Sequence, residues 1–408
     1  METFITKIKV NESRRIRDLE IPLCDNERQH LFITGKNGSG KTGLLIEINK
    51  FLSQIVNGNY KHYSNNKRGL AYSINQLNHT DDNTEIGQKL QIENQIKHNQ
   101  NVLRNFGGVE ITFSKSDLEI LNQYQEGEFL LANFEANRQT NLFVPQGINK
   151  VELKQRYSLQ AEANSNFIQY IVNLKADRSF ARDEGEEDSA KKIDEWFDRL
   201  EKQLKSIFDE PSLKLDFDRK SYNFNIKIDN CEPFDFNTLS DGYSAIISIV
   251  SELLLRMEAR NVKSYDLEGI ALIDEIETHL HVDLQKRIMP FLINFFPKIQ
   301  FIVTTHSPFV LSSISNATVC DLENKTVITD LSAYSYDALL ESYFMTDKYS
   351  EVIKNKIAEY ERLSSKENKT TEDIENINSL CDYFAHVPKY LSRELYVKLQ
   401  QIALHNLK

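Results

Sequence analysis

The 408-residue sequence has few cysteines and no long apolar run. Its four cysteines, Cys24, Cys231, Cys320 and Cys381, are far apart, and no two form a Cys-x-x-Cys pair. This spacing argues against a zinc site or a disulfide framework and fits a reducing cytosol. No stretch approaches the roughly 20 apolar residues of a membrane span, and the N-terminus lacks the apolar segment of a signal peptide. We therefore expect a soluble, cytoplasmic protein without membrane contacts.

Basic residues are fewer than acidic ones: the sequence has 49 Lys and Arg and 60 Asp and Glu, for a net charge of −11. Any nucleic-acid contact must therefore be a local basic patch. Residues 56–105 are rich in Asn, Gln, His and Lys and include such a cluster, at Lys61, His62, Lys67 and Arg68. We interpret the cluster as the solvated face of a polar helix or arm, with possible nucleic-acid contact as the alternative.

Three of the 14 glycines lie within "GKNGSGKT", residues 35–42, which fits the pattern GxxxxGK[ST]. Such a loop directs its backbone N–H groups at phosphate oxygens, and glycine permits the dihedral angles this requires. An apolar strand precedes it and an apolar helix follows, so the loop lies at a helix N-terminus, where anions are favoured. The expected ATP-binding residues are Gly35, Lys36, Asn37, Gly38, Ser39, Gly40, Lys41 and Thr42. We expect Lys41 to reach the β and γ phosphates and the Thr42 hydroxyl to ligate Mg²⁺.

Two more apolar strands end in residues that suit ATP hydrolysis. "GIALIDEIETHLH", residues 269–281, contains Asp274 and Glu275 at a strand end. An aspartate there can hold the Mg²⁺ shell, and the adjacent glutamate is placed to polarise a water for attack on the γ-phosphate. "IQFIVTTHSPFVLSS" ends its strand near His306. Because the carboxyl ends of the strands of such a sheet border the ligand crevice, we expect His306 to sense the γ-phosphate.

The segment "NTLSDGYSAIISIVSELLLRM", residues 237–257, predicts a deeply buried helix capped by Thr238 or Ser240. Gly242 in its first turn lowers helix stability and has no packing value of its own, which suggests that a ligand approaches the backbone closely there. Ser240 and Gly242 therefore mark a second expected anion site besides the loop at 35–42.

"LSDGYSA" resembles the LSGGQ signature of ABC-type ATPases, and "GKNGSGKT", "ALIDE" and "TTH" occur in that family's order. The resemblance covers roughly residues 1–55 and 225–330. It implies an α/β fold, an ABC-type head with a mixed, mostly parallel sheet, helices and an antiparallel N-terminal subdomain. It also implies that the signature of one subunit contacts ATP on the loop of another, in a head-to-tail dimer or higher homo-oligomer. Asp241 departs from the signature and brings negative charge near a phosphate, so we expect slow hydrolysis.

In ABC-type ATPases a glutamine that follows a strand like "EFLLANF" joins the Mg²⁺ shell. Gln139 and Gln146 are both candidates here. Arg138 beside them suits either a phosphate or partner contact or an exposed salt bridge.

The expected domains are an ATPase head over residues 1–330 and a helical extension for partner or oligomer contacts over 331–408. Within the head we expect a polar arm or helical insertion at about 56–105 and a helical subdomain at about 150–225.

"DEIETHLH" followed by "TTHSPFVLSS" resembles the soluble RecF, SMC and OLD-like branch of these ATPases. We expect no nuclease domain like that of OLD proteins in the roughly 100 residues after His306, which offer little room and no acidic motifs for one. A resemblance to the ATPases of Septu, retron-associated Septu-like and PARIS anti-phage systems implies a separately encoded nuclease or toxin as effector. The alternative is a DNA-repair or chromosome-maintenance ATPase that clamps DNA directly, and a transporter subunit is a third possibility.

Overall fold

The computed structural model divides into two compact units, Met1–Tyr334 and Ser335–Lys408, which are described separately. The residues that it describes are 2–79, 86–138, 140–154, 157–159, 163–259, 266–334, 338–339, 351–366 and 368–386.

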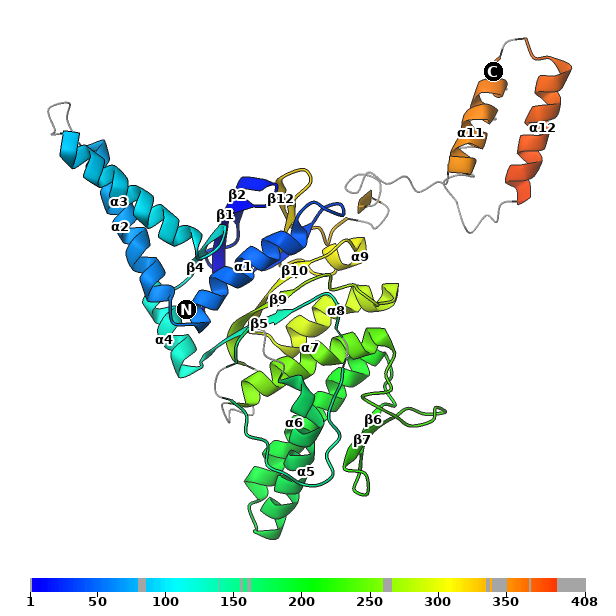
Figure 1. The fold of residues 1–408 in the computed structure, drawn as a ribbon. Coiled ribbons are helices and arrows are strands. Elements are labelled where there is room, and N and C mark those ends of the chain that lie inside the picture. Colours follow the sequence, from blue (N-terminus) through cyan, green and yellow to red (C-terminus); the bar gives the residue numbers. More distant parts are fainter. Residues whose placement is uncertain are drawn as a thin grey trace. The chain divides into compact units, whose positions relative to one another are not determined.

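A six-stranded sheet forms the centre of the first unit (Figure 1), in the order β12-β11-β3-β10-β9-β5. Its strands are β3 (His30–Thr34), β5 (Phe129–Phe134), β9 (Glu268–Ile273), β10 (Ile299–Thr304), β11 (Ala317–Asp321) and β12 (Thr326–Thr329). Neighbours are parallel except β12, which is antiparallel to β11. The inner strands are continuous apolar runs because both faces of the sheet are covered. Parallel pairing brings the carboxyl ends of β3, β9 and β10 to one edge.

A second, antiparallel sheet has the order β2-β1-β4. It consists of β1 (Ile5–Ser13), β2 (Ile16–Pro22) and β4 (Val109–Phe113). Helix α1 (Lys41–Val56) packs against both sheets through Leu44, Ile48 and Phe51, which share a core with apolar residues of β1 and β3. The predicted fold class, with a mostly parallel sheet and an antiparallel N-terminal subdomain, is confirmed.

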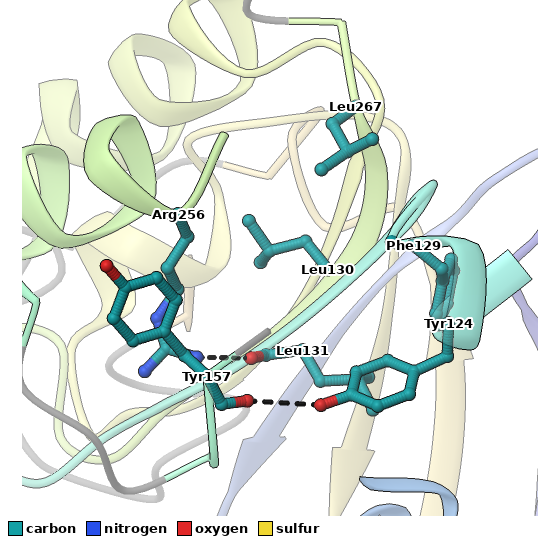
Figure 2. A pocket seen from close by; sticks show the side chains of 8 residues that line it. Tyr124, Phe129, Leu130, Leu131, Tyr157, Arg256 and Leu267 are labelled. Atoms are coloured by element: carbon teal, nitrogen blue, oxygen red, sulfur yellow. Dashed lines mark hydrogen bonds between the residues drawn. The ribbon is translucent and has the colours of Figure 1, made fainter. Parts of the chain in front are cut away.

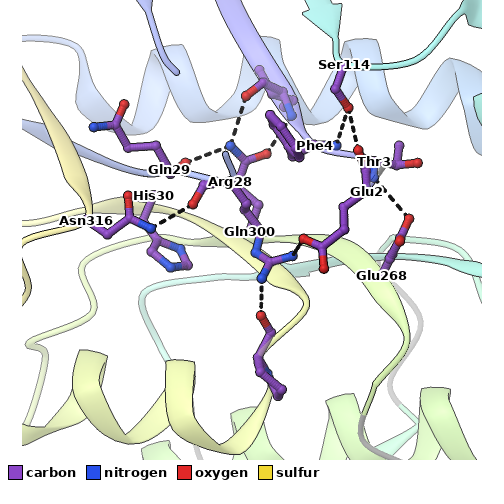
Figure 3. A network of polar contacts seen from close by, with 12 residues as sticks. Glu2, Thr3, Phe4, Arg28, Gln29, His30, Ser114, Glu268, Gln300 and Asn316 are labelled. Atoms are coloured by element: carbon purple, nitrogen blue, oxygen red, sulfur yellow. Dashed lines mark hydrogen bonds and ion pairs between the residues drawn. The ribbon is translucent and has the colours of Figure 1, made fainter. Parts of the chain in front are cut away.

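A buried polar network joins the two sheets (Figure 3). The side chain of Gln300 accepts the N–H of Ile5 at 2.7 Å and donates to the carbonyls of Ile5 and Gln29 at 3.0 and 2.7 Å. Beside it the buried His30 accepts the N–H of Phe301, and burial lowers the pKa of His30 to about 3. The imidazole is therefore neutral at pH 7, and each of these buried polar groups has a partner, as a stable interior requires.

Helices α2 (Tyr60–Asn78) and α3 (Ile86–Arg104) pack along each other as a hairpin (Figure 1). At its base Tyr60 and Tyr63 stack together and meet Phe51 of α1 edge-on. The polar region predicted at about 56–105 is therefore helical where it is described and is attached to the head through aromatic side chains.

The region predicted as helical at about 150–225 is only partly so. It contains α5 (Phe167–Asp183) and α6 (Glu187–Phe208), preceded by a short 3₁₀ turn at Asn164–Asn166. Its last part pairs β6 (Lys214–Asp218) with β7 (Asn223–Lys227), and β8 (Phe234–Asp235) completes a small antiparallel sheet. The alternating pattern of "LKLDFDRKSYNFNIKI" explains this hairpin.

Other helices of the first unit are α4 (Asp117–Glu126), α7 (Asp241–Glu258), α8 (Val282–Phe295) and α9 (Pro308–Leu311). The second unit contains α11 (Glu351–Ser364) and α12 (Thr371–His386), which pack through Tyr360, Leu363 and Leu380. The parts of the predicted helical extension at 340–350 and after residue 386 lie outside the described residues. In the part of the chain that is described, no helix has both the length and the hydropathy of a membrane span.

Candidate active site

The loop at residues 35–42 connects the end of β3 to the start of α1. Gly35, Gly38 and Gly40 have φ angles of 133, 80 and 105°, which side chains other than glycine's adopt rarely. In the described structure, the amide of Ser39 is the only one of those at 36–40 with a hydrogen-bond acceptor, the carbonyl of Lys36 at 3.0 Å. The remaining amides are available to an anion at the N-terminus of α1.

Lys41 lies inside this loop. Its Nζ donates to the carbonyls of Gly35 and Lys36 at 3.0 and 3.3 Å, and the residue is buried. Burial lowers the pKa of Lys41, while nearby carboxylates led by Glu275 act in the opposite direction. Lys36 differs, because its exposed side chain forms an ion pair with Glu323 at 2.5 Å.

Asp274 directly follows β9 and lies next to the start of α1 and the end of β10. One carboxylate oxygen of Asp274 accepts the hydroxyl of Thr42 at 3.3 Å and the hydroxyl of Thr304 at 2.5 Å. The described residues contain no cluster of three or more His, Cys, Asp or Glu suited to a metal. A hydroxyl beside one carboxylate nevertheless fits Mg²⁺, which takes few protein ligands and completes its shell with phosphate and water oxygens.

The turn after Asp274 has unusual backbone geometry. Glu275 and His279 have φ angles of 45 and 65° although neither is glycine, and such conformations cost about 1–3 kcal/mol each. Arg138, which follows β5, is 5 % exposed and donates to the carbonyls of Asp274 and Glu275 at 2.6 and 3.0 Å. Burial lowers its pKa to about 10. An exposed salt bridge, one of the two predictions for Arg138, is therefore wrong.

His306 follows β10 and approaches the same turn. Its backbone N–H donates to Glu277. Neither the second carboxylate oxygen of Glu277 nor His306 Nε2 has a hydrogen-bond partner, although both atoms are buried. Because buried polar atoms are rarely left unpaired, they indicate where a ligand would bind. Burial and the Lys41 charge lower the pKa of His306, so its ring is neutral at pH 7.

The two candidate glutamines are placed differently. Gln139 lies outside the described residues, but its neighbour Arg138 contacts the Asp274 turn. Gln146 is exposed in a loop beside α5, where the carbonyl of Gly147 accepts the side-chain amide of Gln169 at 3.3 Å. The described contacts thus bring the segment of Gln139 to the site, and they place that of Gln146 along the helical insertion.

A hollow of about 370 Å³ lies at the start of α7. Ser240 occupies the N-cap position, is exposed, and makes no capping bond with its side chain. Tyr243 in the first turn stacks on Phe208, with ring centroids 4.1 Å apart. The lining residues are Ile207, Phe208, Asp209, Ser240, Gly242, Tyr243, His279, His281, Asp283, Leu284 and Arg287.

A contact within the protein, and not a ligand, accounts for the glycine at position 242. A Cβ added to Gly242 would lie 2.9 Å from the carbonyl oxygen of His279, closer than van der Waals packing allows. The prediction that Gly242 has no packing value is wrong, because the first turn of α7 packs directly against the segment that follows Glu275.

We therefore expect Gly242→Ala to lower the free energy of unfolding by about 1–3 kcal/mol, through overpacking against a backbone atom. Urea unfolding would measure this change. Gly87→Ala is the control, because Gly87 lies in α3 and a Cβ there meets no atom within 4 Å. Helix propensity should make that variant as stable as the parent or more so. A Gly242→Ala protein of undiminished stability would contradict the close contact.

Buried polar side chains fix α7 to its surroundings. Arg256 donates to the carbonyl of Leu131 in β5 at 2.6 Å (Figure 2) and forms a buried ion pair with Glu252 at 2.7 Å. Glu252 also accepts the N–H groups of Ala163 and Asn164. Because each charged group has partners, the helix is held in one position between the sheet and the helical insertion.

The segment after Arg138 is attached to the same helix. The amide of Thr140 donates to the hydroxyl of Ser244 at 2.8 Å, and Leu142 and Asn237 exchange two hydrogen bonds of 3.0 Å. One short segment therefore contacts both the Asp274 turn and the start of α7.

A phosphate loop between β3 and α1, two acids at the end of β9, a histidine after β10 and a buried helix with an open N-terminus define a P-loop ATPase of the ABC type. A family model described as "AAA domain, putative AbiEii toxin, Type IV TA system" matches residues 31–312. The chain belongs to this family.

Several relatives resemble the chain in sequence. The Septu protein PtuA of Bacillus mycoides (strain KBAB4) is 34% identical over 161 residues, 37% of this chain and 22% of the relative. The "Retron Vc95 probable ATPase" of Vibrio cholerae serotype O1 biovar El Tor is 26% identical over 385 residues, 76% of this chain and 74% of the relative. The "Retron Ec83 probable ATPase" of Escherichia coli is 33% identical over 153 residues, 35% of this chain and 28% of the relative.

The match thus spans about a fifth of the length of PtuA and about three quarters of that of the Vibrio ATPase. The predicted relationship to ABC-type ATPases of the Septu and retron-associated kind is confirmed.

Among solved structures, an SMC head bound to the C-terminal winged-helix domain of ScpA is 12% identical, with a TM-score of 0.37 over 78% of this chain and 94% of that chain. The SMC head domain from Thermotoga maritima is 13% identical, with a TM-score of 0.34 over 77% of this chain and 94% of that chain. The assignment to the class rests on the site geometry and the family model.

Proposed function

We propose that the chain binds and slowly hydrolyses ATP in a head-to-tail dimer or higher homo-oligomer. In this proposal the closed assembly controls a separately encoded effector, such as a nuclease or toxin, in anti-phage defence. The observation that carries it is that the loop at 35–42 and the hollow at the N-terminus of α7 are separate parts of one chain. No residue of the loop at 35–42 lines the hollow at Ser240, so each feature would serve a different nucleotide.

Each site residue has a role in this proposal. Lys41 and the loop amides bind the ATP phosphates, and Glu275 accepts a proton from the attacking water. His306 Nε2 hydrogen-bonds the γ-phosphate, while Ser240 and the open N-terminus of α7 contact the γ-phosphate of the partner's ATP. Thr42 and Asp274, with Gln139 or Gln146, would hold Mg²⁺, which offsets phosphate charge when bound.

Slow turnover follows from Asp241, which is exposed in the first turn of α7. Its carboxylate would lie near the phosphate of the partner's nucleotide, and like charges at close range oppose binding.

The names of the relatives support the defence role, because they include Septu and retron proteins. The second unit offers the helices α11 and α12 for effector or oligomer contacts. A cytoplasmic location is consistent with four cysteines that are all free thiols.

A phage challenge tests the proposal. Cells that express the chain together with the product of the neighbouring reading frame should lower phage plating by at least about 100-fold, since complete protection stops each infected cell from releasing progeny. Lys41→Ala should abolish that protection, because the loss of a phosphate contact at a buried charge removes ATP binding. Protection by the chain without a partner, or protection that survives Lys41→Ala, would contradict the proposal.

One observation favours DNA clamping as a second candidate function. Helices α2 and α3 carry one acidic residue, Glu93, against six basic ones, Lys61, Lys67, Arg68, Lys89, Lys97 and Arg104. ATP-dependent duplex binding by the purified chain, weakening steeply with salt, would support this function. Its absence would leave the effector proposal as the better one.

A further inference from the structure

The buried guanidinium of Arg138 donates hydrogen bonds to backbone carbonyls. Its Nη1 donates to the carbonyls of Glu135 and Asp274 at 2.6 Å each, and its Nη2 to those of Glu275 and Ile276 at 3.0 and 3.4 Å. It forms no ion pair within 4 Å among the described residues, although Asp274, Glu275 and Glu277 are near enough to influence its pKa. Burying a guanidinium costs free energy unless its donors are satisfied. The four carbonyls pair with Nη1 and Nη2, whereas the buried Nε has no hydrogen-bond partner in the described part of the chain. All the hydrogen bonds of the guanidinium there therefore go to backbone carbonyls, three of them in the turn after β9.

The turn is held on its other side by Thr304. The Thr304 hydroxyl accepts the N–H of Glu275 at 2.7 Å, and its carbonyl accepts the N–H of Ile276 at 3.2 Å. Thr304 at the end of β10 therefore holds the amides of Glu275 and Ile276, and Arg138 holds the carbonyls of residues 274–276. Between the two, Glu275 has a φ of 45°, a conformation that persists only where the surroundings impose it.

We propose that Arg138 is a positioning residue for the hydrolytic step, a role that rests on the proposed ATPase activity. By holding three successive carbonyls, it fixes the backbone from which the Asp274 and Glu275 carboxylates extend. General-base catalysis is sensitive to such placement, because a shift of about 1 Å can cost a large rate factor. Lysine cannot replace it, since an ammonium is a compact charge without the planar fork that spans several acceptors.

The first test is Arg138→Lys in the full chain. The ATPase kcat should fall about 10- to 100-fold, while KM for ATP and the affinity for a fluorescent ATP analogue stay within about threefold, because Arg138 does not contact the loop at 35–42. Arg138→Gln, which keeps two donors without charge, is the second variant if the lysine protein does not fold, and its kcat should fall by a similar factor. Arg178→Lys is the control, because Arg178 pairs with Asp194 in the helical insertion.

A double-mutant cycle with Glu275→Gln separates positioning from a general loss of stability. If Arg138 acts through Glu275, adding Arg138→Lys to Glu275→Gln should lower the residual rate by less than about twofold. A parental kcat in both Arg138 variants, or a loss that multiplies fully with that of Glu275→Gln, would overturn the role of Arg138. A parental chain without ATPase activity would instead overturn the proposed function, so the two failures are distinguishable.

Discussion

Replacing Glu275 with glutamine should reduce the ATPase kcat by about 100- to 1000-fold while ATP remains bound, because an amide of the same shape cannot accept the proton of the attacking water. The contacts that hold this turn use the backbone of Glu275, namely its N–H on Thr304 and its carbonyl on Arg138. They survive the substitution, so the lost rate reflects chemistry rather than geometry. Phosphate release measures the rate, and sedimentation with ATP should show the assembly trapped in its closed state.

Glu268→Gln is the matched control for this variant. Glu268 lies at the opposite end of the same strand, β9, where its carboxylate accepts the N–H of Thr3 at 3.0 Å. Glutamine can keep that hydrogen bond, so kcat should change by less than about twofold. Equal turnover in the Glu275→Gln and parental proteins would exclude Glu275 as the base.

The second large effect is expected for Lys41→Ala. The affinity for ATP should fall by at least about 100-fold, the equivalent of about 2.7 kcal/mol, because a charge-assisted hydrogen bond to phosphate is lost in a buried loop. Lys36→Ala is the control in the same loop, because the contact proposed for residue 36 is made by its backbone amide, which alanine keeps. The side chain of Lys36 is 73 % exposed and paired with Glu323, so its loss should change the affinity by less than about threefold. Titration calorimetry measures both, and similar losses in the two variants would contradict the special role of Lys41.

Lys41→Ala also tests the head-to-tail arrangement, in combination with Ser240→Arg, which would block the hollow at α7. Each variant alone should be inactive. An equimolar mixture should recover up to about a quarter of the parental rate, because random pairing makes half of the dimers mixed, each with one intact site. A mixture as inactive as its components would contradict composite sites.

The parts of the site that are local in sequence could be predicted, and those that depend on distant contacts could not. The loop at 35–42 and the acids after β9 follow apolar strands. The resemblance to ABC-type ATPases implied a mostly parallel sheet, in which the carboxyl ends of the strands border the ligand crevice. Arg138 lies 136 residues before Asp274, so no local pattern connects them. Glu277 could have been noticed as the second acid of "EIE", but only the fold brings it to His306.

Gly242 illustrates the same limit. Its cost to the helix was visible in the sequence, yet the reason, the carbonyl of His279, appears only once α7 and the turn after β9 pack together. A glycine in a helix indicates a close approach without identifying what approaches.

The position of the sole tryptophan has a practical consequence. Trp196 of α6 is 3 % exposed and donates its indole N–H to Glu258 at 2.8 Å, near the end of α7. Indole emission responds to the polarity and charge around the ring, and here the Glu258 carboxylate of α7 is hydrogen-bonded to the indole. The protein therefore contains an intrinsic fluorophore on α6 that is hydrogen-bonded to α7, and a displacement of α7 relative to α6 would change the emission of the unlabelled chain.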